Sequence, residues 1–168
     1  QGTGIIMERG PSGEADLIAS ICKATKTPTY TAAEAVVEAL RAMAMQRIVL
    51  IHPLGDIPVK REQTYLEASG FSVIHAVGLG RQEQSAFIPS ETWLDVARNN
   101  DHVGADGFFL SGSNTTMFEA VEQIEKELGK PVVTSVQASL WAGVQRVLGV
   151  GNAYEALPPS IGQLFTVG

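Results

Sequence analysis

Short apolar runs alternate along this chain with stretches of helical apolar spacing. The runs 47–51, 71–77, 107–110 and 131–135 predict strands, because parallel strands covered on both faces are largely apolar. Apolar side chains at the spacing of a helix occur in residues 13–26, 32–43, 58–68, 89–99, 116–128 and 137–148. Strands that alternate with helices predict βαβ units, right-handed crossovers and an α/β fold with a parallel sheet.

A small polar loop stands between the strand at 107–110 and the next helix. Its members are Ser111, Gly112, Ser113 and Asn114. Open α/β sheets bind ligands at the carboxyl ends of their strands, and a helix N-terminus favours an anion. The loop could instead be a helix cap that binds nothing, since Thr116 and Glu119 have the spacing of a capping box. Thr116 alone would suffice for that, so the additional small polar residues favour a binding site.

His52 lies where the strand at 47–51 ends, beside Pro53. A structural role and a catalytic, proton-donating role both stay open for it. The other two histidines, His75 and His102, are far from it in the sequence, and the three show no metal-ligand spacing. We therefore expect no metal site.

Composition narrows the class of protein. The chain has 168 residues and a formal net charge of −6, with its basic residues scattered, so nucleic acid and anionic membranes are poor partners. The single cysteine, Cys22, excludes an internal disulfide and indicates a reducing compartment, so we expect a cytoplasmic protein. Gly78-Leu79-Gly80 lacks the third glycine of a dinucleotide site, and we expect no cofactor.

The second half of the chain resembles a known superfamily. Residues 111–149 read SGSNTTMFEAVEQIEKELGKPVVTSVQASLWAGVQRVLG, which is similar to the aspartate/glutamate racemase superfamily, in particular the branch of maleate cis-trans isomerase and arylmalonate decarboxylase. The positions that match the motif of that branch are Leu128-Gly129, Pro131-Val132-Val133, Thr134-Ser135, Gln137-Ala138 and Trp141. Residues 27–54 and the opening GTGIIMERG extend the resemblance over nearly the whole chain.

The resemblance implies parallel sheets in two pseudo-symmetric lobes with the site between them. Residues 1–31 and 136–168 would then be parts of the first lobe, and residues 32–135 the second lobe. Members of the family have roughly 70 further residues before the opening loop, about half a lobe by ordinary domain sizes. We therefore expect that the first lobe is incomplete here and that the chain is a piece of a longer one.

The resemblance also implies a site for a small dicarboxylate without a cofactor. The substrate-binding positions would be Gly2, Thr3, Gly4, Ser111, Gly112, Ser113 and Asn114. Family racemases and isomerases use two cysteines, which fall here on Gly2 and Gly112, and the family tyrosine after the strand falls on Leu54. The donors that would hold the anion therefore match, while the thiols that transfer protons do not. The family also implies possible self-association into a homo-oligomer.

Three functions stay open on these grounds. A decarboxylase-like lyase acting on a malonate-type acid is the leading interpretation, because it needs only a stabilised enediolate and one proton, from His52 or from water. A maleate cis-trans isomerase is the alternative within the family, although its covalent thioether needs a thiol. A non-catalytic carboxylate-binding protein is the alternative from another class.

Overall fold

The computed structural model describes residues 3–81, 83–148 and 161–167. Its centre is a four-stranded, fully parallel sheet in the order β2-β1-β3-β4, formed by β1 (Arg47–His52), β2 (Ser72–Gly78), β3 (Gly107–Leu110) and β4 (Val132–Thr134). The predicted α/β fold with a parallel sheet is confirmed. Within the described ranges all strands belong to this one sheet, so the division into two lobes stays a prediction.

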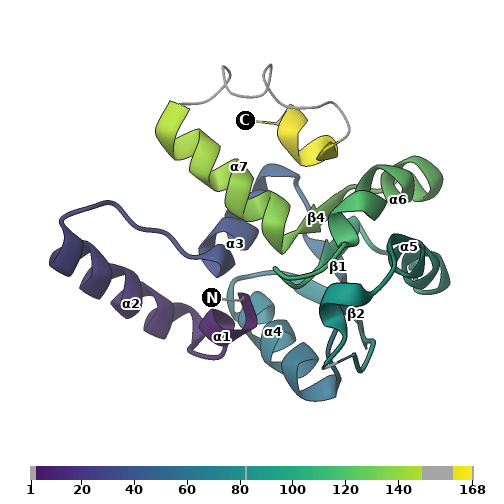
Figure 1. The fold of residues 1–168 in the computed structure, drawn as a ribbon, viewed down its shortest axis with the longest axis horizontal. Helices are drawn as coiled ribbons and strands as arrows, with labels where there is room; N and C mark the ends of the chain where they lie inside the picture. The colour runs from purple at the N-terminus through teal and green to yellow at the C-terminus, as the bar shows by residue number, and fades with distance from the viewer. Residues whose placement is uncertain (1–2, 82, 149–160, 168) are drawn as a thin grey trace.

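Helices cover both faces of the sheet (Figure 1). The helices α3 (Ala32–Ala42), α4 (Asp56–Ala68) and α7 (Ser135–Leu148) pack on one face, and α5 (Ser90–Asn99) and α6 (Val121–Leu128) on the other. Successive residues of β1 supply the two cores in turn, since Ile48 and Leu50 lie in one apolar cluster and Val49 and Ile51 in the other. This double burial explains why residues 48–51 of the strand are all apolar.

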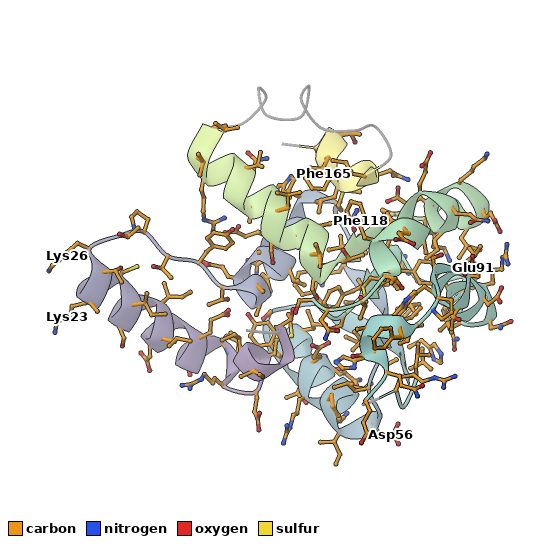
Figure 2. All side chains as sticks on the ribbon, viewed as in Figure 1. Lys23, Lys26, Asp56, Glu91, Phe118 and Phe165 are labelled. Atoms are coloured by element: carbon orange, nitrogen blue, oxygen red, sulfur yellow. The ribbon has the colours of Figure 1, made fainter. Side chains whose placement is uncertain are left out.

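Two helices precede the sheet. The short helix α1 (Thr3–Met7) buries Ile6 and Met7 in the core, and α2 (Gly10–Thr25) follows it directly. In Figure 1, α2 projects from the body of the molecule, and Figure 2 shows Lys23 and Lys26 at its outer end. Glu14 is the buried residue of α2, so this helix is docked through a carboxylate more than through apolar packing.

Local signals place most helix ends. Thr31 caps α3, because its side chain accepts a hydrogen bond from the Glu34 N–H. The predicted end of α6 at Gly129 is confirmed, with this residue in the left-handed conformation at φ 65°. Figure 2 shows Asp56 and Glu91, which lie in the first turns of α4 and α5, where a negative charge complements the helix dipole.

Three local predictions are wrong. The opening residues Thr3 and Gly4 are helical, whereas their glycine-rich context predicts a loop. Thr116 and Glu119 form no capping box, because the Thr116 hydroxyl donates to the Ile88 carbonyl oxygen instead. A 3-10 turn at Met117–Ala120 (η2) therefore separates the polar loop from α6, and the loop does not lie at an α-helix N-terminus.

Within the described ranges, no helix is both long enough and apolar enough to cross a membrane.

Candidate active site

The site lies where the order of the strands reverses. From β1 the chain passes through α4 to β2 on one side, and then returns to place β3 on the other side of β1. Parallel α/β sheets bind ligands outside the carboxyl ends of the strands at such a switch point. His52 ends β1 and Ser111 follows β3, so the pairing of Ile51 with Leu110 brings these two polar residues side by side.

A cavity of about 410 Å³ opens at this point, which is a volume typical of a small-molecule site. It is bounded by α1, by α4, by the end of β1 and by the polar loop. The predicted site residues that line it are Thr3, Gly4, His52, Ser111, Gly112, Ser113 and Asn114. The structure therefore brings together residues that are up to about a hundred positions apart in the sequence. The eighth, Gly2, lies outside the described residues.

Glu62 is the residue that the sequence analysis missed. It lies on α4, lines the cavity and is 0% exposed. Its Oε1 accepts a hydrogen bond of 2.8 Å from the Ser111 hydroxyl. Burial raises the pKa of the Glu62 carboxyl to about 7, although the bond from Ser111 opposes this shift. The sequence does contain a signal for Glu62, because this residue shares the inward, apolar face of α4 with Val59 and Leu66. A carboxyl group on such a face contributes nothing to apolar packing, which indicates another role.

Gly4 allows Glu62 to come close to α1. A Cβ atom at Gly4 would lie 3.3 Å from Glu62 Oε1, closer than most side-chain contacts. The helical turn that opens the chain can therefore cover the carboxyl group directly. A larger residue at position 4 would crowd the Glu62 carboxyl group, which explains the glycine there.

His52 is buried beside this carboxyl. Its Nδ1 accepts a hydrogen bond of 2.9 Å from the Leu54 N–H, which places the hydrogen of the neutral ring on Nε2. Nε2 lies 3.7 Å from Glu62 Oε1. Burial lowers the pKa of His52 to about 4, so the ring is neutral at pH 7. A neutral imidazole is a poor proton donor, and the geometry gives His52 a positioning role beside Glu62.

Three buried polar atoms of the cavity wall have no hydrogen-bond partner among the described residues. They are Thr3 Oγ1, Thr115 Oγ1 and Glu62 Oε2. Buried polar groups are nearly always paired in folded proteins, and an unpaired group in a cavity indicates a place for water or a ligand. Two hydroxyl donors in the lining of one cavity, one from α1 and one from the residue that follows the polar loop, suit a carboxylate.

The polar loop has a constrained backbone at Gly112. Its φ is +124°, a region that other residues rarely adopt, and its N–H donates to the Ser135 hydroxyl over 3.1 Å. An added Cβ would lie 3.2 Å from a methyl group of Thr115 and 3.3 Å from Pro53. A cysteine at this position would therefore carry strain as well as a thiol.

The mouth of the cavity combines charge and apolar surface. Arg61 and Glu8 form an ion pair of 3.1 Å there, both about half exposed. Ile5, Leu54 and Pro58 provide an apolar wall next to these charges. Such a wall can accept an aryl or alkyl group while the polar end holds carboxylates.

Cys22 stands apart from the site. It is half buried on α2 and does not line the cavity. Since it is the single cysteine of the sequence, the cavity has no thiol.

The sequence and the fold both match known proteins. A family model described as arylmalonate decarboxylase matches residues 1–165. Arylmalonate decarboxylase of Bordetella bronchiseptica is 27% identical over 168 residues, which are 98% of this chain and 68% of that protein. Maleate isomerase of Alcaligenes faecalis is 24% identical over 142 residues, 83% of this chain and 54% of that protein. The chain thus spans between half and about two thirds of the length of these relatives.

Solved structures agree with this assignment. A crystal structure of arylmalonate decarboxylase superposes with a TM-score of 0.88 and 27% identity, covering 100% of this chain and 73% of that one. The predicted membership of the racemase superfamily, in the branch of the decarboxylase and the isomerase, is thereby confirmed. The chain belongs to the arylmalonate decarboxylase family.

Proposed function

We propose that this protein is a lyase that removes carbon dioxide from a small malonate-type dicarboxylate without a cofactor. The observation that carries the proposal is the pair of hydroxyls without a partner among the described residues, Thr3 Oγ1 and Thr115 Oγ1, in the lining of a cavity that also has an apolar side. Together with the similarity to arylmalonate decarboxylase, this favours a substrate with carboxylates at one end and an aryl or alkyl group at the other.

The chemistry follows from what the cavity provides. When a malonate loses carbon dioxide, negative charge develops on the remaining carboxylate as an enediolate. Hydroxyl and backbone donors already placed around that group stabilise the charge without reorganising. The carbon that lost carbon dioxide then takes up one proton. No other reaction of this family needs fewer catalytic groups.

The absence of a thiol disfavours the isomerase alternative. Isomerisation through a thioether needs a nucleophile that attacks carbon, and the hydroxyls of Ser111 and Ser113 are weaker nucleophiles than a thiolate. Ser111 already donates to a carboxyl of raised pKa, and His52 is turned to Glu62 rather than to a hydroxyl. Maleate is therefore expected to bind without being converted.

The test is an assay of carbon dioxide release from aryl- and alkylmalonates, with maleate-to-fumarate conversion measured in parallel. The native protein should release carbon dioxide and leave maleate unchanged, and dialysis against a chelator should not lower the rate. Gly112→Cys adds the family thiol, and Gly112→Ala is its matched control, because both carry the same backbone strain.

Each result discriminates between the functions. Release by the native protein supports the lyase. Release in Gly112→Cys alone, with none in the native protein or in Gly112→Ala, identifies a binding protein that has lost its chemistry. No release from any folded variant contradicts the proposal.

A further inference from the structure

The carboxyl group of Glu62 is unusual for a buried acid because it has no cation partner. One oxygen, Oε1, accepts from Ser111, while Oε2 is buried and unpaired within the described part of the chain. Burying an ionised carboxylate without a cation partner costs free energy, and the neutral acid avoids that cost. The geometry therefore places a proton on the unpaired Oε2, on a residue that lines the cavity.

The groups around this carboxyl do not neutralise it. From β1 it faces the neutral His52 ring, from α1 it faces Gly4, and from the polar loop it faces the Ser111 hydroxyl. The charged groups of the cavity, Arg61 and Glu8, are paired with each other at the mouth. The pKa of about 7 then follows from burial, and half of the Glu62 side chains carry a proton near pH 7.

Ser111 connects this proton to the substrate space. It is 1% exposed, lines the cavity and contacts Glu62 through a single hydrogen bond. The residue beside it, Gly112, is the position where the family thiol stands. A hydroxyl that turns from Glu62 towards the cavity can donate its own hydrogen outward and take the hydrogen of Glu62 in exchange.

We propose that Glu62 and Ser111 together replace the missing thiol, with Glu62 as the proton source and the Ser111 hydroxyl as the group that protonates the reacting carbon. This inference rests on the proposed decarboxylation. The bond between the substrate carbon and one carboxylate breaks, carbon dioxide leaves, and its electron pair remains in the enediolate. The carbon then takes the Ser111 hydrogen. The Glu62 carboxyl group turns about its Cγ–Cδ bond, which brings the protonated oxygen to Ser111, and Ser111 takes the Glu62 hydrogen. Glu62 becomes a carboxylate that solvent reprotonates.

The experiment compares pH–rate profiles of malonate decarboxylation. In the native protein kcat should fall about tenfold per pH unit above pH 7, because the protonated acid is required. This decrease is the alkaline limb of the pH–rate profile. Glu62→Gln should lower kcat at least ~100-fold and abolish this limb, with KM changed little. Ser111→Ala should lower kcat but keep the limb. Glu125→Gln, which changes another buried carboxyl outside the cavity, is the matched control and should keep both rate and limb.

A second assay separates this inference from the proposed function. Exchange of the α-hydrogen of the monoacid product in deuterated water needs proton transfer but no decarboxylation. If the native protein decarboxylates and Glu62→Gln keeps its rate and limb, the inference is overturned while the function stands. If no diacid reacts, the proposed function is wrong. If the native protein then still exchanges the α-hydrogen and Glu62→Gln does not, Glu62 remains supported as the proton source. If the native protein shows no exchange, the inference about Glu62 is overturned as well.

Discussion

Two neighbouring residues at the switch point respond to burial in opposite directions. Burial raises the pKa of Glu62 to about 7 and lowers the pKa of His52 to about 4. The folded state therefore holds the Glu62 proton more tightly than the unfolded chain does, and binds a proton at His52 less tightly. Stability from Glu62 is present at low pH and declines as pH rises to about 7. Stability from His52 is present above about pH 6.5 and declines as pH falls towards 4.

In the native protein the pH dependence of stability from Glu62 offsets that from His52. Removing the Glu62 carboxyl should therefore leave the His52 contribution visible. Glu62→Gln is expected to gain stability relative to the native protein as pH rises from 4.5 to 7, by about 3 kcal/mol at most. Denaturant unfolding at several pH values measures this difference. Glu91→Gln, which removes an exposed carboxyl of α5, controls for the loss of a negative charge. A constant difference between Glu62→Gln and native protein across this range would contradict the assignment.

Thr115 and Thr116 are adjacent, but of these two hydroxyls only that of Thr116 has a hydrogen-bond partner among the described residues. Thr115→Val removes a buried, unpaired hydroxyl, so it should leave the free protein as stable or raise its stability by about 1 kcal/mol. The same change should weaken malonate binding by about 0.5–1.5 kcal/mol. Thr116→Val, the matched control, removes the hydroxyl that donates to Ile88 and should destabilise the protein instead. Calorimetric titration measures malonate affinity and thermal unfolding measures stability for both variants. Unchanged malonate affinity in Thr115→Val would count against the anion site.

At the scale of elements, the strands were predictable and several helix boundaries were not. Burial on both faces explains the apolar runs 48–51 in β1 and 107–110 in β3, and their short length favours strands over buried helices. The start of α1 was not predictable, since Thr3 and Gly4 are weak helix formers and tertiary packing of Ile6 and Met7 decides their conformation. Glu62 was hidden for a similar reason, because its burial depends on elements that are distant in the sequence.

The docking of α2 leads to a prediction about this helix. The carboxylate of Glu14 accepts hydrogen bonds from the Tyr65 hydroxyl, the Thr31 hydroxyl and the Glu34 N–H, and thus joins α2 to α3 and α4. Tyr65→Phe should lower the free energy of unfolding by about 1–3 kcal/mol and increase hydrogen exchange along α2. Ser20→Ala, on the exposed side of α2, should leave both unchanged. Equal exchange in Tyr65→Phe and native protein would mean that α2 is held by other contacts.

At the scale of the whole molecule, the order of the strands decides which residues meet. The order β2-β1-β3-β4 makes β1 and β3 neighbours, although α4, β2 and α5 lie between them in the sequence. The repeated βαβ pattern predicted a parallel sheet with the polar loop at a strand end. It did not predict which strands are adjacent, and that adjacency brings His52 to Ser111.

The same arrangement predicts that the protein does not racemise amino acids. Racemisation needs an acid–base group on each face of the reacting carbon. The positions of the two family thiols, Gly2 and Gly112, supply neither. No D-enantiomer should form from L-aspartate or L-glutamate, as measured by chiral chromatography, under conditions in which malonate binds. Measurable racemisation would show that a second acid–base group reaches the cavity.

The short helix α1 meets the cavity from outside the sheet. Ile5 and Glu8 face the mouth, Ile6 and Met7 anchor the turn in the core, and Gly4 passes over the carboxyl. Under the proposed mechanism, choice of substrate and delivery of the proton would then be encoded in separate stretches of sequence. Variation at Ile5 can retune which side group is accepted while the acid on α4 stays untouched, so a library confined to this one turn is the economical starting point for directed evolution of new selectivity.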